Sequence, residues 1–338
     1  MNKTCLLTVI IPTYNRAPEL KKTLKSFIRN KNPKICFLIL NNSSTDNTTD
    51  VVKSYIKKDN RIKLINNKKN LGVALSLKLG LEKFKTPFCT IISDQYILVG
   101  NYFEWVIKIF MNNKKVNIVH HDNSNDNNQK HYQIYREGLE SATKAFNFAS
   151  FISGLSFRKS NLRLSNYPKN PKAIYIQLFP IIHLTKKGKF AQIYNCKFKI
   201  LKKALKPLTR KLELKMMKEL SARQSRPSDW GLFEMVNYIH QSNYSTFEKM
   251  VILQKKLIWI CKITKQLPYI NYIYTLKKME KIFGNYFIFY YIYLIIYRFD
   301  IYVLIVLLKK IVSFKYYKNH IIALLIFFIY VYRKVIRN

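Results

Sequence analysis

The sequence predicts an α/β fold: a mostly parallel β-sheet flanked by helices, followed by a mainly helical C-terminal region. Two observations lead to this fold class. Short apolar runs alternate with helical patterns over the first 120 residues, and 49% of the 338 residues are hydrophobic. Alternating strands and helices indicate a parallel sheet with helices on both faces. The chain is long enough for about two domains of roughly 150 residues each.

The expected strands are continuous apolar runs bounded by turn residues, the pattern of parallel strands buried on both faces. The first run ends at the turn residues 12–15, and the second at the polar loop 41–46. The carboxyl ends of parallel strands meet at one edge of a sheet, where ligands of such folds bind. Five strands are predicted, at Leu6–Ile11, Ile35–Leu40, Ile62–Ile65, Phe88–Ser93 and Val116–His120.

The expected helices lie between these strands. The first follows Pro18, and its apolar residues Leu20, Leu24 and Phe27 recur at helical spacing. The Ser and Thr residues of the loop 41–46 are suited to cap the second helix. Four helices are predicted, at Glu19–Ile28, Asn47–Lys57, Val73–Phe84 and Tyr102–Met111.

Beyond residue 120 the pattern is less regular. The Asn/Asp-rich segment Asp122–Lys130 is expected to be a loop or mobile lid, and Ile152–Arg158 a strand with a kink at Gly154. Further helices are expected at Ala173–Thr185, Lys203–Arg223 and Trp230–Ile239. The chain therefore divides into an α/β core (1–125), a second part of the same domain (126–225) and a helical, basic and aromatic region (226–338).

The chain is strongly basic, with 59 Lys and Arg against 18 Asp and Glu and a formal net charge of +41. Such a charge favours a polyanionic partner, for example nucleic acid, an anionic membrane or a phosphorylated substrate. A bias toward A/T-rich codons, which specify Lys, Asn, Ile, Tyr and Phe, would explain the excess equally well. The five cysteines lack metal-binding spacing, so neither a zinc site nor a disulfide framework is expected. Free cysteines indicate a protein of a reducing compartment.

Three motifs in the first 82 residues resemble those of one enzyme family. TVIIPTYNRAPELKKTLKSFI is similar to the opening of family 2 glycosyltransferases, LILNNSSTDNTTDVV to their second-strand motif, and NLGVALSLKLGL to a later segment. FISGLSFRKS resembles a strand near the acceptor side in members that build surface polysaccharides, although a buried strand explains it as well. The resemblance implies a GT-A (Rossmann-like) fold and an inverting, nucleotide-sugar-dependent hexosyltransferase.

The resemblance assigns donor binding to the loops after the first, second and fourth strands. Thr13, Tyr14 and Asn15 carry groups that reach a nucleotide, and Arg16 adds positive charge for the diphosphate. Asn42, or its neighbour Asn41, takes the place of an aspartate that accepts a hydrogen bond from the base; an amide oxygen also accepts one, without charge. The alternative is that residues 12–15 form an ordinary turn and that Asn42 is a loop residue without a role in binding. The expected nucleotide-sugar-binding residues are Pro12, Thr13, Tyr14, Asn15, Arg16, Asn42 and Asp94.

The expected metal motif is incomplete. Family members follow the fourth strand with several acids that hold Mg²⁺ or Mn²⁺, whereas this chain has Asp94 followed by Gln95 and Tyr96. Three outcomes stay open. Asp94 binds Mg²⁺ or Mn²⁺ weakly, the basic loops neutralise the diphosphate instead, or activity has been lost.

An inverting transfer also needs a general base, which the family takes from an Asp or Glu of the second half. No Asp or Glu lies between Ser141 and Leu212, where 16 Lys and Arg fall. The candidate catalytic residues are therefore acids outside this window: Asp229, Glu234 and Glu137. Asp229 is equally suited to cap a helix. His183 titrates near neutral pH, but its apolar neighbours favour a packed role.

The C-terminal region, residues 283–338, is mostly apolar and aromatic. Its longest apolar runs, Ile282–Tyr297 and Ile321–Tyr332, are shorter than the ~20 residues of a spanning helix. Tyrosines beside lysines favour contact with an anionic membrane surface, and a helical cap on the catalytic domain is the alternative. The N-terminus has no small-residue cleavage site, so no signal peptide is expected. We therefore expect a cytoplasmic protein, peripheral at the inner face of the plasma membrane.

The leading hypothesis is a glycosyltransferase that moves a sugar from a UDP- or other NDP-sugar to a glycan or lipid-linked acceptor, in lipopolysaccharide- or capsule-type polysaccharide biosynthesis. A degenerate, non-catalytic family member that acts as a membrane-associated scaffold is the alternative. Nucleic-acid binding rests on charge alone, because the sequence has no helix-turn-helix, zinc-finger or RNA-recognition signature. No nucleic-acid partner is expected.

Overall fold

The computed structural model describes residues 4–121, 131–148, 152–165, 167, 176–194, 196–201, 235, 237–249 and 251–253. All of them lie within one compact unit, Met1–Leu267. The predicted lid Asp122–Lys130, the predicted helix Lys203–Arg223, the C-terminal region from residue 254 and the candidate acids Asp229 and Glu234 lie outside the described residues. Within the described ranges, no helix has both the length and the apolar character needed to span a bilayer.

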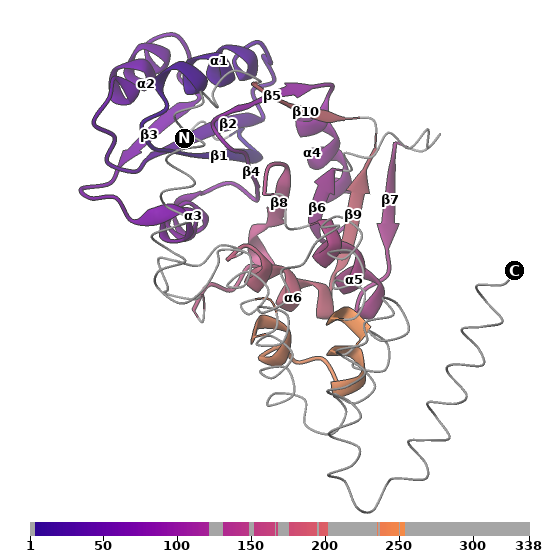
Figure 1. Cartoon of the computed structure of the whole chain (residues 1–338). Helices are drawn as coiled ribbons and strands as arrows, with labels where there is room; N and C mark the ends of the chain where they lie inside the picture. The colour runs from indigo at the N-terminus through magenta and orange to yellow at the C-terminus, as the bar shows by residue number, and fades with distance from the viewer. Residues whose placement is uncertain are drawn as a thin grey trace, which may run out of the picture. The chain divides into compact units, whose positions relative to one another are not determined.

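The centre of the fold is an eight-stranded mixed sheet in the order β3-β2-β1-β4-β8-β6-β9-β7 (Figure 1). Strands β3, β2, β1 and β4 pair with one another in parallel, and β6 pairs with β9 in parallel. Strands β8 and β7 run antiparallel to their neighbours. A separate antiparallel pair joins β5 to β10. The strands are β1 Leu7–Thr13, β2 Ile35–Asn41, β3 Ile62–Asn66, β4 Phe88–Ile91, β5 Tyr96–Val99, β6 Val116–His121, β7 Tyr132–Tyr135, β8 Leu155–Arg158, β9 Lys189–Ile193 and β10 Lys197–Ile200.

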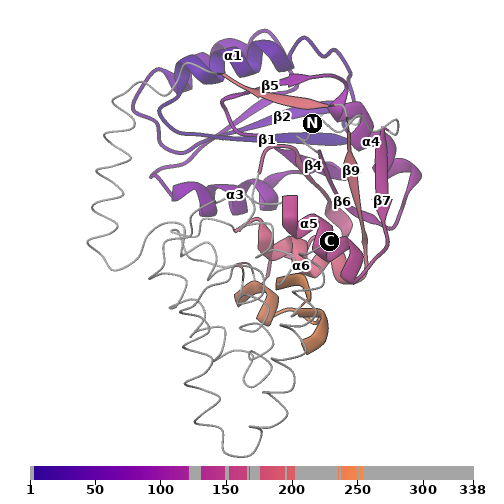
Figure 2. The same cartoon turned by 45° about the vertical axis from the view of Figure 1, so that its right-hand side comes forward.

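Helices cover both faces of this sheet. Helices α1, α2 and α4 share one buried apolar cluster with β1 and β2, and α3 lies on the other side of these strands (Figure 2). Helices α5 and α6 pack against each other and against β6. The helices are α1 Ala17–Phe27, α2 Thr48–Ile56, α3 Gly72–Lys83, α4 Tyr102–Asn112, α5 Leu139–Phe148 and α6 Leu178–Lys186, with a short 3₁₀ turn at Lys159–Asn161.

The two faces of β1 explain its continuous apolar run. Leu7, Val9 and Ile11 belong to the cluster with α1, α2 and α4, while Ile10, also fully buried, faces α3. Gly80 lets α3 approach closely, because a Cβ at that position would lie 2.7 Å from side-chain carbons of both Ile10 and Leu40. The buried double-sided sheet expected from the sequence is therefore present.

The nine elements predicted over the first 121 residues are all confirmed, with ends that move by a few residues. The predicted strand Phe88–Ser93 ends earlier, at Ile91, so Ser93 and Asp94 belong to the following loop. The predicted helix Ala173–Thr185 is described from residue 176 and begins at Leu178, because Ile176 and Gln177 form a turn. The predicted helix Trp230–Ile239 is helical where it is described. Strands β5, β7, β9 and β10 were not predicted from the sequence.

Candidate functional site

Three loops meet at the edge of the sheet where β1, β2 and β4 end. Strands β1 and β2 are paired in parallel up to Thr13 and Asn41, and the backbone N–H of Asn42 donates to the carbonyl of Thr13 at 2.9 Å. Strand β4 lies on the other side of β1. The segments 12–16, 41–46 and 93–95 therefore form one polar surface at the carboxyl edge.

A charged group forms where the first and third of these loops meet. The guanidinium of Arg16 donates from Nη1 to Oε1 of Gln95 at 2.8 Å, and its Nε lies 4.0 Å from Oδ1 of Asp94. The Arg16 side chain is 43% exposed, whereas that of Asp94 is 6% exposed. Two partners, Gln95 and Asp94, therefore orient the Arg16 guanidinium, and its exposed part presents positive charge to solvent.

The carboxyl of Asp94 has an unusually high pKa. Burial raises the pKa of its carboxyl to about 6, and the Arg16 guanidinium and the hydroxyls of Thr13 and Ser93 reverse only part of that increase. A single cation that is partly exposed to water offsets only part of the free-energy cost of burying a carboxylate. The negative charge that faces Arg16 therefore depends on pH near neutrality.

Neutral hydrogen bonds hold the loop that carries Asp94. The hydroxyl of Thr23, on α1, donates to the Asp94 carbonyl at 2.8 Å. Ser153, in the segment that precedes β8, accepts from the backbone N–H of Ser93 at 3.0 Å, and Gly154 next to it has a φ of +87°, a conformation that suits glycine. The predicted strand Ile152–Arg158 therefore begins only at Leu155, and Ser153 and Gly154 form a turn before it rather than a kink within it. This turn places Ser153 at the edge where Asp94 lies.

The loops after β1 and β2 are locked together by Asn15. Its backbone N–H donates to Oγ of Ser44 at 2.9 Å, and its Oδ1 accepts from the backbone N–H of Thr45 at 2.8 Å. These groups of Asn15 are already used within the protein, so the structure gives it a positioning role beside Arg16.

Asp46 connects the starts of two helices. Its Oδ2 accepts from the N–H of Ala17, the first residue of α1, at 3.1 Å, and its Oδ1 accepts from the N–H of Thr48, the first residue of α2, at 3.0 Å. Burial alone would raise the pKa of Asp46, but a hydrogen bond from the Thr48 hydroxyl, together with those from the two backbone N–H groups, outweighs it and holds the pKa below its usual value. Asp46, rather than the Ser or Thr residues expected from the sequence, satisfies these N–H groups.

Asn42 is the centre of a group of amide side chains, which we call the asparagine cluster: Asn42, Asn67 and Asn70. Oδ1 of Asn42 accepts from Nδ2 of Asn67 at 3.0 Å and from the backbone N–H of Leu71 at 2.9 Å. Its Nδ2 donates to Oδ1 of Asn70 at 2.6 Å. Asn42 is buried, so its side chain is enclosed by these partners.

Asn41, the neighbouring candidate, is equally occupied. Its Nδ2 donates to Oγ1 of Thr49 at 2.9 Å and to Oδ1 of Asn66 at 3.1 Å, and its Oδ1 accepts from the N–H of Ser44 at 3.2 Å. Asn41 is 2% exposed. It therefore connects β2, β3 and α2.

Tyr14 is the exposed aromatic residue of this edge. Its side chain is 43% exposed, although it directly follows the buried end of β1. Pro12 and Thr13 belong to β1 itself. Of the residues predicted to contact a ligand, Tyr14 and Asn15 are exposed, and the side chain of Arg16 is 43% exposed. Tyr14 offers a flat apolar ring and Arg16 a cation.

The described residues do not form a site for a divalent cation. Such ions take several oxygen ligands and favour carboxylates, but Asp94 is buried and its neighbour Gln95 already accepts from Arg16. The carboxylate of Asp46 lies at the same edge with both oxygens used by helix starts. No group of three or more His, Cys, Asp or Glu side chains suited to a metal occurs in the described part of the chain.

Glu137 lies at the opposite edge of the sheet. It forms an ion pair with Lys115 at 3.5 Å, and Lys115 precedes β6. Because β4 and β6 are both antiparallel to β8, the start of β6 lies away from the carboxyl end of β4. The structure therefore does not bring Glu137 together with Asp94. His183, on α6, contacts Phe179 with ring centroids 4.7 Å apart.

Two buried histidines that we did not single out from the sequence end β6 at the same edge as Asp94. The rings of His120 and His121 stack with centroids 4.8 Å apart, and the ring of Tyr102 packs against His121. The Tyr102 hydroxyl donates to the carbonyl of Gly154. The available signal was their place at the carboxyl end of a predicted strand.

Comparison with protein families identifies the domain that carries this edge. Residues 8–167 match the model of "Glycosyl transferase family 2". The match spans β1 to β4, the charged group and Ser153. Residues 8–167 form a family 2 glycosyltransferase domain. The family predicted from the three motifs is confirmed.

Curated relatives of this family 2 domain match part of the chain. An uncharacterized glycosyltransferase of Haemophilus influenzae is 25% identical over 111 residues, 33% of this chain and 44% of the relative. The putative teichuronic acid biosynthesis glycosyltransferase TuaG of Bacillus subtilis is 32% identical over 78 residues, 23% of this chain and 31% of that protein. The alignments thus span less than half the length of these relatives.

Solved structures share the fold over more of the chain. TarS of S. aureus (residues 1–349) has a TM-score of 0.62 at 13% identity and covers 84% of this chain and 82% of TarS; the same protein has been solved with UDP-GlcNAc. The mannosyltransferase PcManGT of Pyrobaculum calidifontis, solved with GDP-Man and Mn²⁺, has a TM-score of 0.50 at 13% identity over 85% of this chain and 83% of PcManGT. The predicted GT-A fold is confirmed.

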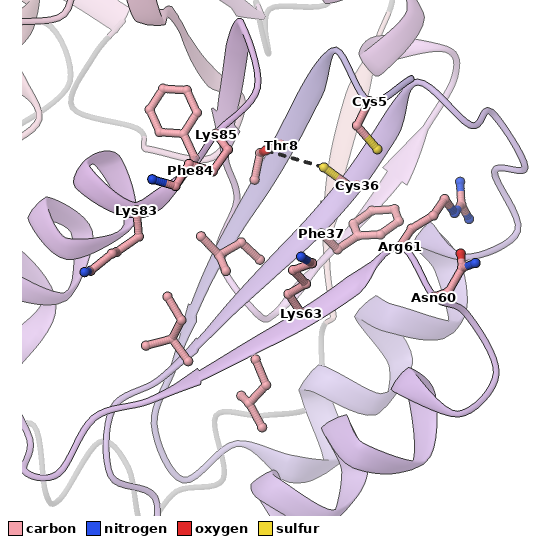
Figure 3. A pocket seen from close by; sticks show the side chains of 13 residues that line it. Cys5, Thr8, Cys36, Phe37, Asn60, Arg61, Lys63, Lys83, Phe84 and Lys85 are labelled. Carbon is pink, nitrogen blue, oxygen red and sulfur yellow. Dashed lines mark hydrogen bonds between the residues drawn. The ribbon is translucent and has the colours of Figure 1, made fainter. Parts of the chain in front are cut away.

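A cavity of about 270 Å³ opens at the other edge of the family 2 domain (Figure 3). Residues near the starts of β1, β2 and β3 line it, among them Thr8, Cys36 and Lys63. Burial raises the pKa of the Cys36 thiol to about 12, and its sulfur lies 3.4 Å from Oγ1 of Thr8. A thiol with this pKa is protonated at neutral pH and is not an activated nucleophile.

Proposed function

We propose that the protein is a glycosyltransferase that transfers a sugar from a nucleotide-sugar to a glycan or lipid-linked acceptor. The observation that carries this proposal is the charged group at the carboxyl edge of the family 2 domain. There a half-exposed Arg16 is oriented by Asp94 and Gln95. An oriented guanidinium is well suited to bind phosphate oxygens by charge-assisted hydrogen bonds.

Tyr14 supports the same assignment. Its exposed ring lies two residues from Arg16 in the chain, so a base stacked on Tyr14 and a diphosphate at Arg16 belong to one ligand. Stacking of a base on an aromatic side chain contributes about 1–3 kcal/mol. Together the two residues would bind the nucleotide and leave the sugar toward Ser153 and the end of β6.

The acceptor and the stereochemistry belong to this proposal as expectations. The relative TuaG is named for teichuronic acid biosynthesis, and the segment 151–160 resembles that of enzymes of surface-polysaccharide assembly, which favours a lipopolysaccharide- or capsule-type glycan. We expect an inverting hexosyl transfer with Asp229 or Glu234 as candidate base. We also expect peripheral binding to an anionic membrane, because nine Lys and Arg and one acid occur in residues 281–338.

The predicted Mg²⁺ or Mn²⁺ stays a prediction. PcManGT is solved with Mn²⁺, whereas the described residues around Asp94 here lack a matching set of oxygen ligands. Donor binding measured in EDTA and again with added MnCl₂ separates the two cases. Affinity that rises more than tenfold with MnCl₂ supports the ion, and unchanged affinity supports phosphate neutralisation by Arg16.

A donor panel tests the proposal directly. The purified full chain is titrated with UDP, GDP, CDP and dTDP sugars, and sugar release and transfer are followed by mass spectrometry. We expect Arg16→Ala to weaken binding of the preferred donor by about tenfold to a hundredfold, because a charge-assisted contact to phosphate is lost. Arg29→Ala, an exposed arginine beyond the end of α1, is the matched control. Neither binding nor transfer with any donor would instead support the scaffold alternative.

A further inference from the structure

The oxygen of Asn42 is saturated by the protein itself. A carboxamide oxygen has two lone pairs, and that of Asn42 accepts from Asn67 Nδ2 at 3.0 Å and from the Leu71 N–H at 2.9 Å. Its Nδ2 is directed to Asn70. Although Asn42 stands where the family resemblance places a base-binding residue, this oxygen has no capacity left for the N–H of a base.

Two backbone N–H groups fix the orientation of all three amides. The Leu71 N–H can only donate, so the Asn42 atom that faces it is the oxygen, and the group that faces Asn70 is the NH₂. The matching atom of Asn70 is therefore Oδ1, and the Gly72 N–H confirms this by donating to it at 2.9 Å. Asn67 turns its NH₂ toward the Asn42 oxygen. A flip of any one amide would set like groups against each other.

The fixed orientation leaves one acceptor and one donor of the asparagine cluster unused by the other two amides and by the backbone N–H groups of Leu71 and Gly72. These are Oδ1 of Asn67 and Nδ2 of Asn70, neither of which has a hydrogen-bond partner among the described residues. Asn70 is exposed and Asn67 half-buried. Both contact the buried carboxamide of Asn42, and the backbone N–H of Asn42 donates to the carbonyl of Thr13, the residue before Tyr14.

We propose that Asn67 and Asn70 read the edge of the donor nucleobase and that Asn42 is a positioning residue that orients them. This inference rests on the proposed function, because it needs a nucleotide at this edge. Asn67 Oδ1 accepts the ring N–H of the base, and Asn70 Nδ2 donates to the adjacent carbonyl. The substrate class follows from that pairing.

An imide edge matches this pair in either direction. In uracil, and in its 5-methyl analogue thymine, the N3–H lies between two carbonyls, so a donor on either side of the acceptor finds a partner. Guanine has a carbonyl on one side of its N1–H and an amino group on the other. Cytosine and adenine present a ring acceptor in place of the ring N–H. The fixed acceptor–donor pair therefore favours UDP- or dTDP-sugars.

The experiment compares nucleotide preference in two variants that add the same charge. Asn70→Asp keeps an oxygen for Asn42 Nδ2 and for the Gly72 N–H but replaces the outward donor with an acceptor. Asn66→Asp adds a carboxylate at the end of the neighbouring strand β3 and keeps the oxygen that Asn41 uses. Affinities of UDP, dTDP, CDP, GDP and ADP for the full chain are measured by calorimetry, and thermal melts verify folding.

We expect the unaltered protein to bind UDP and dTDP at least tenfold more tightly than the other three nucleotides. Asn70→Asp should lower the ratio of UDP to CDP affinity about tenfold, the value of about one hydrogen bond, whereas Asn66→Asp should leave that ratio unchanged. Comparison of UDP with dTDP shows which imide base is preferred.

Two results overturn the inference without touching the proposed function. One is an equal UDP-to-CDP ratio in Asn70→Asp and the unaltered protein. The other is a preference of the unaltered protein for GDP, CDP or ADP, in each case with binding that Arg16→Ala weakens. If none of the five nucleotides binds to the unaltered protein, the proposed function and this inference fail together.

Discussion

The asparagine cluster and the charged group lie at the same edge of one sheet but consist of different kinds of side chain, neutral amides in the cluster and ionisable groups in the charged group. The cluster is neutral, and backbone N–H groups fix each of its amides in one orientation. The charged group depends on a buried carboxyl whose pKa burial raises to about 6 and on a guanidinium that is 43% exposed. Neutral networks specify hydrogen-bond direction, whereas charged groups supply attraction that pH and salt modulate.

The largest change in the free energy of unfolding is expected for a substitution in the neutral asparagine cluster. Asn42→Ala removes three hydrogen bonds from a buried side chain, each worth about 1 kcal/mol, so the free energy of unfolding should fall by about 3 kcal/mol. No titrating group takes part, so the loss should be equal at pH 5 and pH 8. Urea denaturation at both pH values measures it.

Asn66→Ala is the matched control for this variant. Asn66 lies one residue from the cluster at the end of β3, and the structure gives its side chain a single hydrogen bond, from Asn41. We expect a loss of about 1 kcal/mol or less. A similar loss in both variants would contradict the central role of Asn42.

The charged region should behave in the opposite way. The pKa of Asp94 in the folded protein, about 6, lies above its ordinary value of 3.8, so the folded state binds the proton more tightly than the unfolded state does. Stability therefore falls as pH rises from about 4 to beyond 6, and the ionised carboxylate costs about 2–3 kcal/mol above that range. Asp94→Asn removes the charge and should stabilise the ligand-free protein by about 2 kcal/mol at pH 8.

The pH profile provides the check on Asp94→Asn. At pH 4 the carboxyl of the unaltered protein is mostly protonated in the folded state, so the variant and the unaltered protein should have nearly equal stability. Denaturation midpoints at pH 4, 5, 6, 7 and 8 should therefore diverge steadily. Parallel profiles would show that Asp94 titrates at its ordinary pKa.

The same contrast explains how much the sequence could predict. The alternation of strands and helices around β1 to β4 is encoded locally, by apolar runs and turn residues, and the resemblance of the three motifs predicted which loops meet. The identity of Arg16 as the accessible cation was predicted as well. The strands, helices and turns depend on residues close together in the chain, and the meeting of their loops follows from the parallel order of the strands.

The distant partners of Asn42, Asp46 and Ser153 could not be predicted, because they lie 25 or more residues away in the chain. Asn42 contacts Asn67 and Asn70 across the end of β3, Asp46 reaches back to the start of α1, and Ser153 reaches the loop after β4. Periodicity indicates which face of an element is buried but not which distant loop covers it. The burial that raises the pKa of Asp94 is a consequence of such contacts.

The smallest effect tests whether the charged group depends on a neutral support. Ser153→Ala removes the oxygen that accepts from the Ser93 N–H at 3.0 Å and leaves that N–H without this partner. We expect a loss of about 1 kcal/mol in the free energy of unfolding, without any change in the pH range over which stability falls. Ser54→Ala, on the exposed side of α2 with a bond only to a carbonyl of its own helix, is the control and should change stability by less than about 0.5 kcal/mol. If Ser153→Ala also shifted the pH range, Ser153 would act on the carboxyl of Asp94 and not only on the backbone beside it. The neutral hydrogen bond at Ser93 would then be part of the charged group rather than separate from it.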